Sequence, residues 1–65
     1  MAENVYLEDV LVKVTTDKAL LVVVEDEEHW IPRSQIVEDE TVIREKGDRG
    51  TLCITKWIAT QKGLD

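Results

Sequence analysis

Two valine-rich segments lie close together in the first third of this chain, with only three polar residues between them. Valine recurs at every second position from Val10 to Val14, which is the period of a half-buried strand, and a continuous apolar run follows at 19–24. That run is too short and too β-branched for a helix. Thr16-Asp17-Lys18 supplies turn chemistry between the segments. The pattern predicts a β-hairpin of strands over about 6–15 and 19–24, with the second strand either covered on both faces or central in a curled sheet.

Three further segments have strand-like composition, and turn-forming or charged residues bound each of them. His29-Trp30-Ile31 is followed by Pro32, which lacks an amide donor and therefore ends the strand or places it at a sheet edge. Residues 41–44 and 51–54 are predicted as a fourth and a fifth strand. Two glycines and an aspartate between these strands, at 47–50, predict a hairpin turn.

Helical signals are confined to two short segments. Ser34 is placed to cap a helical turn over 35–37. Thr55 is placed to cap a C-terminal helix over 56–62, and Gly63 stands at the stop position, with Leu64 folding back on the helix. A single mainly β domain over residues 1–65 is therefore expected: a small five-stranded curled sheet or partly open barrel, SH3-like or OB-like, with a short C-terminal helix.

The small core predicts self-association. One core in a chain of 65 residues supplies only about 3–5 kcal/mol of stability, and the single cysteine, Cys53, excludes an internal disulfide. Unpaired strand edges also favour pairing between chains, and two-fold dimers are the commonest soluble oligomers. We therefore predict a homodimer, with strands or the helix that carries Trp57 at the contact.

The sequence contains no motif for catalysis or for metal binding. His29 is the only histidine and Cys53 the only cysteine, so zinc spacing is absent, and a nucleophilic pair of the two would require direct contact. Cys53 is predicted to occupy an ordinary strand position. Glu25–Glu28 lacks the ligand spacing of a calcium loop, and Gly47–Gly50 lacks the lysine of a phosphate-binding loop. The sequence predicts no enzyme activity, no cofactor and no metal.

Acidic residues dominate the charge and gather in two clusters that are predicted to be exposed connections. Fourteen acidic residues against eight basic ones give a net charge of −6, which repels phosphate backbones and anionic membranes. The leading hypothesis is a binding module that presents these clusters to a basic surface of another protein. The predicted partner-binding residues are Glu25, Asp26, Glu27, Glu28, Glu38, Asp39 and Glu40.

The alternative hypothesis is a single-stranded nucleic-acid-binding protein of the small-barrel type, in which tryptophans stack on bases and basic residues contact phosphates. It requires Trp30 to be exposed beside Arg33. In a chain without phenylalanine, both tryptophans are expected to anchor the core instead. The residues of this alternative site are Trp30, Arg33, Arg44, Lys46, Arg49 and Trp57.

Targeting signals are absent from the sequence. The N-terminal residues have neither a basic stretch nor an apolar core, and the longest apolar run has six residues, whereas a membrane-spanning helix needs about 20. A lone thiol is typical of a reducing compartment. We expect a soluble cytoplasmic protein that does not enter membranes.

Several separated segments resemble one known group of proteins. Residues 30–36 (WIPRSQI), 47–52 (GDRGTL), 57–59 (WIA) and 62–64 (KGL) are similar, in this order, to a family of small uncharacterised proteins from phages, prophages and bacterial genomes. The resemblance covers about residues 18–64. It implies a phage-associated accessory domain, and it implies no activity, cofactor or catalytic residue.

Overall fold

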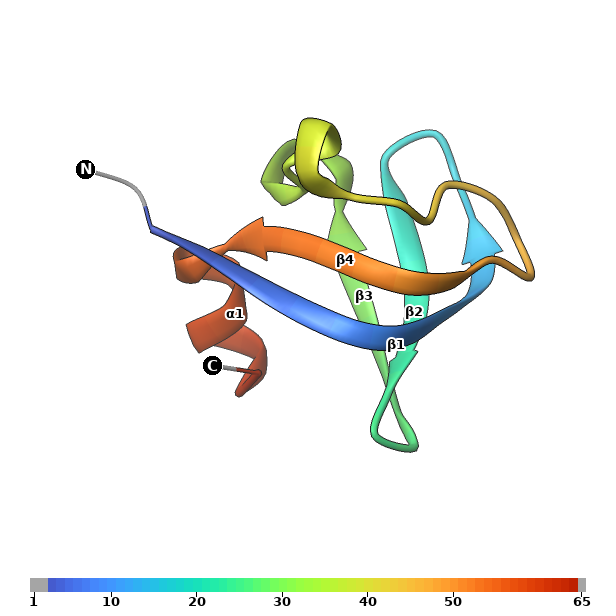
Figure 1. The fold of residues 1–65 in the computed structure, drawn as a ribbon, viewed down its shortest axis with the longest axis horizontal. Helices are drawn as coiled ribbons and strands as arrows, with labels where there is room; N and C mark the ends of the chain where they lie inside the picture. Colours follow the sequence, from blue (N-terminus) through green and yellow to red (C-terminus); the bar gives the residue numbers. More distant parts are fainter. Residues whose placement is uncertain (1–2, 65) are drawn as a thin grey trace.

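The computed structural model describes residues 3–64 and shows a curled antiparallel sheet followed by a short helix (Figure 1). The sheet has the order β3-β2-β1-β4 and consists of β1 (Asn4–Thr15), β2 (Ala19–Val24), β3 (Glu27–Pro32) and β4 (Arg49–Thr55). The 3-10 helices η1 (Arg33–Gln35) and η2 (Glu38–Glu40) lie between β3 and β4, and α1 (Lys56–Lys62) follows β4. The predicted mainly β fold with a C-terminal helix is confirmed.

The predicted hairpin of β1 and β2 is present, and a threonine side chain closes its turn. Oγ1 of Thr16 accepts hydrogen bonds from the backbone N–H groups of Lys18 (3.3 Å) and Ala19 (3.0 Å). β2 lies between β1 and β3, with Leu20, Val22 and Val24 buried in the core and the alternate side chains partly exposed. Of the two environments predicted for this strand, the central position in a curled sheet is therefore the one observed.

Two irregularities in β1 decide which of its side chains reach the core. Its pairing with β4 shifts between Leu7 and Val10, and its pairing with β2 shifts between Val12 and Val14. Each extra residue reverses the alternation of side chains between the two faces. Val10 and Val12 are buried, whereas Val14 is 39% exposed on the opposite face. The two-residue period of the valines predicts that Val10, Val12 and Val14 share one face of the sheet. This prediction is wrong for Val14.

The first acidic cluster contributes to a strand as well as to a turn. Only Glu25 and Asp26 form the connection between β2 and β3, both with positive φ (51° and 69°), as in the tight turns that fit the twist of a hairpin. Glu27 and Glu28 already belong to β3 and pair with Val24 and Val23. The prediction of a four-residue connection is corrected accordingly, although all four acidic side chains are exposed.

The predicted fourth strand is not formed: residues 41–44 belong to no strand, and the sheet has four strands within residues 3–64. The chain instead runs along the free edge of β4 through separate contacts: a bridge between Ile36 and Ile54, and hydrogen bonds from the N–H groups of Val37 to Cys53 O (2.9 Å) and of Val42 to Thr51 O (3.0 Å). The predicted glycine turn lies slightly earlier than expected. The chain reverses over 45–48, and Arg49 and Gly50 belong to β4.

Both ends of α1 are capped as predicted. Oγ1 of Thr55 accepts the N–H of Ile58, Gly63 adopts φ +70°, and Leu64 N–H donates to Ala59 O at 2.7 Å. Ile58 and Ala59 face the core. The core consists of Val10, Val12, Leu20, Val22, Val24, Ile31, Ile43, Leu52, Ile54, Ile58 and Ala59. Within residues 3–64, no helix has the length and apolar character needed to cross a bilayer.

Candidate functional site

Both tryptophans are on the surface, so the prediction that they anchor the core is wrong. Trp30 is 44% exposed and Trp57 is 61% exposed. Trp30 pairs with Leu21 across β3 and β2 on the side of the sheet that faces away from the core, and its neighbour Ile31 fills the core position. α1 buries Ile58 and Ala59. Aliphatic side chains therefore fill the core, and the rings of both tryptophans contribute apolar area to the surface.

An apolar surface, which we call the outer sheet face, extends over β1, β2 and β3. Cross-strand pairing joins its members directly: Leu11 with Val23, Val14 with Leu21, and Leu21 with Trp30. The outer sheet face consists of Leu11, Val14, Leu21, Val23 and Trp30. Each of these side chains is partly or largely exposed. Contiguous apolar patches of this kind mark interaction sites more often than single exposed residues do.

Ion pairs lie at the edge of the outer sheet face. Lys13 Nζ is 2.6 Å from Glu28 Oε2, and Glu28 pairs with Val23 across the strands. Arg49 Nη1 is 3.1 Å from Asp9 Oδ1, and Arg49 pairs with Leu11. These exposed ion pairs contribute little stability. They place alternating charge around an apolar centre, which is the common composition of a protein interface.

The two acidic clusters do not form one surface. The turn of Glu25 and Asp26 lies at one end of the molecule, and η2, which contains Glu38–Glu40, lies at the opposite end (Figure 1). Of the predicted partner-binding residues, only Glu25–Glu28 adjoin the outer sheet face, because Glu28 pairs with Val23 on it. The three acidic residues of η2 are exposed but separate from this surface.

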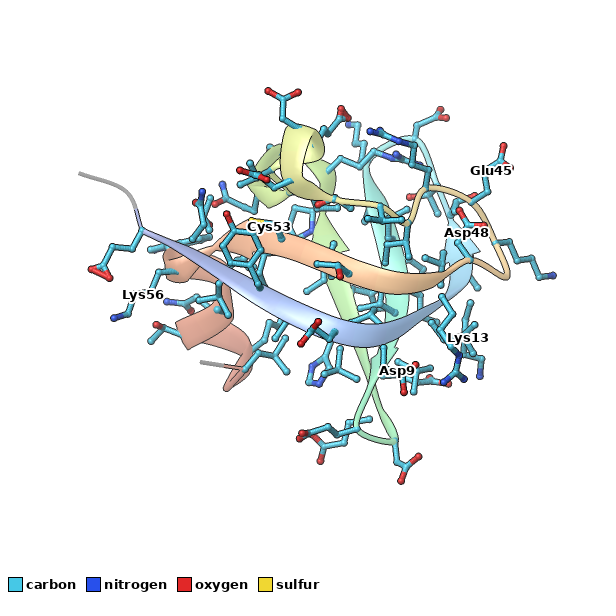
Figure 2. All side chains as sticks on the ribbon, in the orientation of Figure 1. Asp9, Lys13, Glu45, Asp48, Cys53 and Lys56 are labelled. Carbon is cyan, nitrogen blue, oxygen red and sulfur yellow. The ribbon has the colours of Figure 1, made fainter. Side chains whose placement is uncertain are left out.

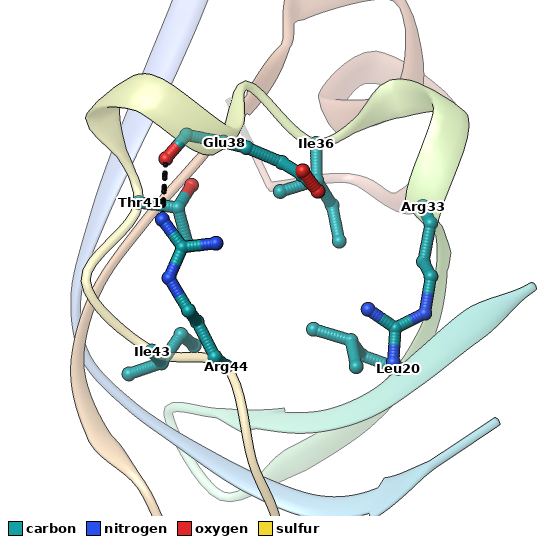
Figure 3. Close-up of a pocket in the computed structure, with 7 residues that line it drawn as sticks. All are labelled: Leu20, Arg33, Ile36, Glu38, Thr41, Ile43 and Arg44. Atoms are coloured by element: carbon teal, nitrogen blue, oxygen red, sulfur yellow. Dashed lines mark hydrogen bonds between the residues drawn. The ribbon is translucent and has the colours of Figure 1, made fainter. Parts of the chain in front are cut away.

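A pocket lies between η1, η2 and the loop before β4. It has a volume of about 140 Å³ and is lined by Leu20, Arg33, Ile36, Glu38, Thr41, Ile43 and Arg44. Leu20 and Ile43 are core residues, and Ile36 packs against the core. The guanidinium groups of Arg33 and Arg44 lie on opposite sides of this pocket, and each directs a terminal nitrogen toward its middle (Figure 3). The floor is therefore apolar and the rim is cationic.

Backbone carbonyl groups hold both arginines in place. Arg33 Nε donates to Thr16 O at 2.8 Å, and Arg44 Nη2 donates to Glu38 O at 3.2 Å. Neither guanidinium lies within ion-pairing distance of a carboxylate among the described residues, although Glu38 belongs to the pocket lining. Each arginine keeps terminal N–H donors available to a ligand.

The basic and aromatic residues of the nucleic-acid hypothesis are spread over the molecule. Arg33 and Arg44 share the pocket, Arg49 is paired with Asp9, and Lys46 is exposed in the 45–48 turn. The tryptophans belong to β3 and α1. The structure brings together two of the six predicted residues. Sequence reasoning did not identify the apolar part of the pocket, since Leu20 and Ile43 read as ordinary core positions.

Cys53 is buried on β4, and two groups contact it. It pairs with Tyr6 on β1, and its backbone is bonded to Thr41. Burial raises the pKa of the Cys53 thiol, and the charge of Glu40 raises the pKa of Tyr6. A raised thiol pKa is the opposite of what a nucleophile requires. β1 and β2 separate Cys53 from His29, so the two do not form a catalytic pair.

His29 has a largely buried side chain on β3. Its Nε2 atom is buried without a hydrogen-bond partner and lies 3.7 Å from Glu27 Oε1. No group of three or more metal-ligating side chains is present among residues 3–64. Comparison of the chain with protein families, with curated proteins and with solved structures finds no match.

Proposed function

We propose that this chain is a non-enzymatic binding module that contacts another protein through the outer sheet face. The observation that carries the proposal is Trp30, which is 44% exposed and in register with Leu21 and Val14 on adjacent strands. Tryptophan is enriched among the residues that dominate binding energy. Exposed aromatic and aliphatic side chains with a charged edge match the usual core and rim of an interface.

The acidic residues near this surface favour a partner with basic groups beside an apolar patch. Glu25 and Asp26 continue from the end of the outer sheet face without an ion-pairing partner among the described residues. Complementary charge at a rim steers association and fixes orientation. The earlier hypothesis of acidic contact is kept for Glu25–Glu28, while Glu38–Glu40 at the far end have no part in it.

Capture of partners from a lysate of the source cells tests this proposal. Trp30→Ser is expected to remove the captured protein, because it takes away the largest apolar contact. A variant with Asp39→Asn and Glu40→Gln serves as control, since these residues are exposed and lie at the opposite end of the molecule. If the control variant loses the partner and Trp30→Ser retains it, the surface is misassigned.

Exposure of both tryptophans supports single-stranded nucleic-acid binding as a second candidate function, because stacking on bases requires accessible rings. The scattered basic residues and the net charge of −6 count against it. A labelled oligonucleotide at low ionic strength decides the matter. Binding that weakens steeply with salt supports this candidate, and absence of binding removes it.

We propose further that the curled sheet is a partly open barrel of the SH3-like or OB-like kind in a cytoplasmic, phage-associated protein. The contacts of Ile36, Val37 and Val42 along the edge of β4 support the barrel, because they cover part of an edge that an open sheet would leave free. The buried thiol of Cys53 supports a reducing compartment. Slow amide exchange at Val37 and Val42 is expected if this edge is covered in solution.

The homodimer also remains a proposal, and the outer sheet face, the β3 edge and α1 with its exposed Trp57 are surfaces available to it. Sedimentation at increasing concentration tests it directly. A mass that stays at 7.4 kDa contradicts a dimer. If the mass doubles, the same measurement on Trp30→Ser shows whether the outer sheet face is the contact: a variant that stays monomeric places the contact there.

A further inference from the structure

We propose that the pocket between Arg33 and Arg44 binds the carboxylate-bearing last residue of a peptide chain whose final side chain is aliphatic. This pocket belongs to η1, η2 and the loop before β4, and it is separate from the outer sheet face. The inference therefore stands independently of the function proposed above.

The placement of the two arginines is the first argument. In a chain with 14 acidic and eight basic residues, two guanidinium groups face one pocket, and neither is ion-paired among the described residues. Backbone carbonyl groups fix one donor of each, at 2.8 Å for Arg33 and 3.2 Å for Arg44. Their remaining donors are thus oriented before a ligand arrives. Guanidinium donors of this kind suit the planar geometry of a carboxylate.

The charge of the pocket favours a single negative charge on the ligand. Arg33 and Arg44 contribute two positive charges, and Glu38 contributes one negative charge to the lining. A carboxylate, with one negative charge, neutralises the net positive charge of this lining. A doubly charged phosphate would leave a net negative charge in the pocket, beside the carboxylate of Glu38. The carboxylate of Glu38 lies near Ile36 above the middle of the pocket (Figure 3), where it can accept an N–H group adjacent to the bound carboxylate.

The floor and the size of the pocket define the rest of the ligand. Leu20, Ile36 and Ile43 give an apolar floor, which favours an aliphatic side chain. A volume of about 140 Å³ is well below the roughly 300 Å³ at which pockets for drug-sized molecules begin. There is room for one small side chain and a carboxylate. Because Arg44 and Glu38 are exposed, the rest of a peptide has a path out into solvent.

The test compares two forms of one short N-acetylated peptide that ends in leucine, one with a free carboxylate and one with a C-terminal amide. Binding to the unmodified protein is measured by titration, with the Arg33 and Arg44 side-chain Nε–H signals followed by NMR. The free acid is expected to shift both signals and to bind about tenfold or more tightly than the amide, as expected when a charge-assisted contact is lost.

Variants locate the contact. Arg44→Gln is expected to weaken the free acid to the level of the amide, and Arg33→Gln is expected to do the same. Arg49→Gln is the matched control, because Arg49 is an exposed arginine outside the pocket, and it is expected to leave binding unchanged. Since the acid and amide are compared on unaltered protein, the test does not depend on the folding of any variant.

Several results overturn the proposal. These are equal binding of acid and amide, no binding of the acid at millimolar concentration, and chemical shift changes that map to Trp30 instead of the pocket. Free leucine that binds as tightly as the peptide also contradicts it, because the ligand is then a free amino acid. A short oligonucleotide that displaces the peptide and binds more tightly contradicts the preference for a carboxylate.

Discussion

The side chain of Thr41 forms hydrogen bonds with the backbone of Cys53 at the edge of β4. Thr41 Oγ1 accepts the Cys53 backbone N–H at 3.0 Å, and it lies 3.2 Å from Cys53 O and 2.8 Å from Val37 O, to which its hydroxyl donates. Thr41 is the one buried polar residue among those described. This hydroxyl thus adds to the backbone hydrogen bonds of Val37 and Val42, which cover the edge of β4 where no regular fifth strand pairs with it.

Replacing this hydroxyl is therefore expected to destabilise the protein. Thr41→Val keeps the shape but leaves the buried Cys53 N–H without an acceptor, which costs about 1–3 kcal/mol of unfolding free energy. Chemical denaturation measures the change. Thr41→Ser keeps the hydroxyl and is expected to lose less than half as much. Equal losses in the two variants would show that the methyl group, and not the hydrogen bond, is what matters.

Asp48 fixes the 45–48 turn and makes stability depend on pH. Its Oδ2 accepts the N–H groups of Arg44 (2.9 Å) and Glu45 (2.8 Å), and these bonds lower the pKa of Asp48 below its ordinary 3.8. Asp48 directly precedes β4 (Arg49–Thr55), and Cys53, to which Thr41 is bonded, lies toward the other end of that strand (Figure 2). Folding therefore favours the ionised form of the Asp48 side chain.

A group whose pKa is lowered by folding contributes stability above its unfolded pKa and loses that stability as the pH falls through the folded value. We expect Asp48→Asn to be less stable than the unmodified protein at neutral pH. The difference should shrink as the pH falls below about 4, the ordinary range of an aspartate. Asp17→Asn, in the exposed first turn, is the control. A difference between Asp48→Asn and the unmodified protein that stays constant down to acid pH contradicts this role.

The turn between β2 and β3 carries a backbone cost that can be removed. Glu25 and Asp26 both have positive φ, a conformation that costs ordinary residues about 1–2 kcal/mol. Asn-Gly is preferred in such turns. Glu25→Asn with Asp26→Gly is expected to raise the unfolding free energy by about 1 kcal/mol. Glu25→Gln with Asp26→Gln removes the charges without introducing a residue that favours positive φ, and an equal gain from that pair would assign the effect to charge repulsion.

Much of the fold could be predicted from local patterns. The β1–β2 hairpin, the edge position of the strand that ends at Pro32, and the caps at Thr55 and Gly63 follow from residue types whose backbone preferences are strong. The outward turn of Val14 did not follow, because a bulge between Val12 and Val14 leaves no mark in the valine period. The absence of a strand at 41–44 did not follow either, because composition does not reveal that this segment meets β4 through the Thr41 hydroxyl and one backbone hydrogen bond of Val42.

The candidate surfaces were less predictable than the fold. Both Trp30 and Ile31 suit a buried strand position, and only the register with β2 shows that Ile31 takes the core position and Trp30 the outer one. Arg33 and Arg44 were identified as candidates for phosphate contact. That they share a pocket with Leu20 depends on how the segment after β3 crosses the end of the sheet.

The central claim is that the outer sheet face is the contact surface. A photo-reactive amino acid placed at Leu21, in the middle of that face, tests it most directly, with the same group at Ser34, an exposed position on η1, as control. Irradiation in the presence of the captured partner is predicted to give a covalent adduct from position 21 and none from position 34. An adduct from position 34 and none from position 21 would contradict the account.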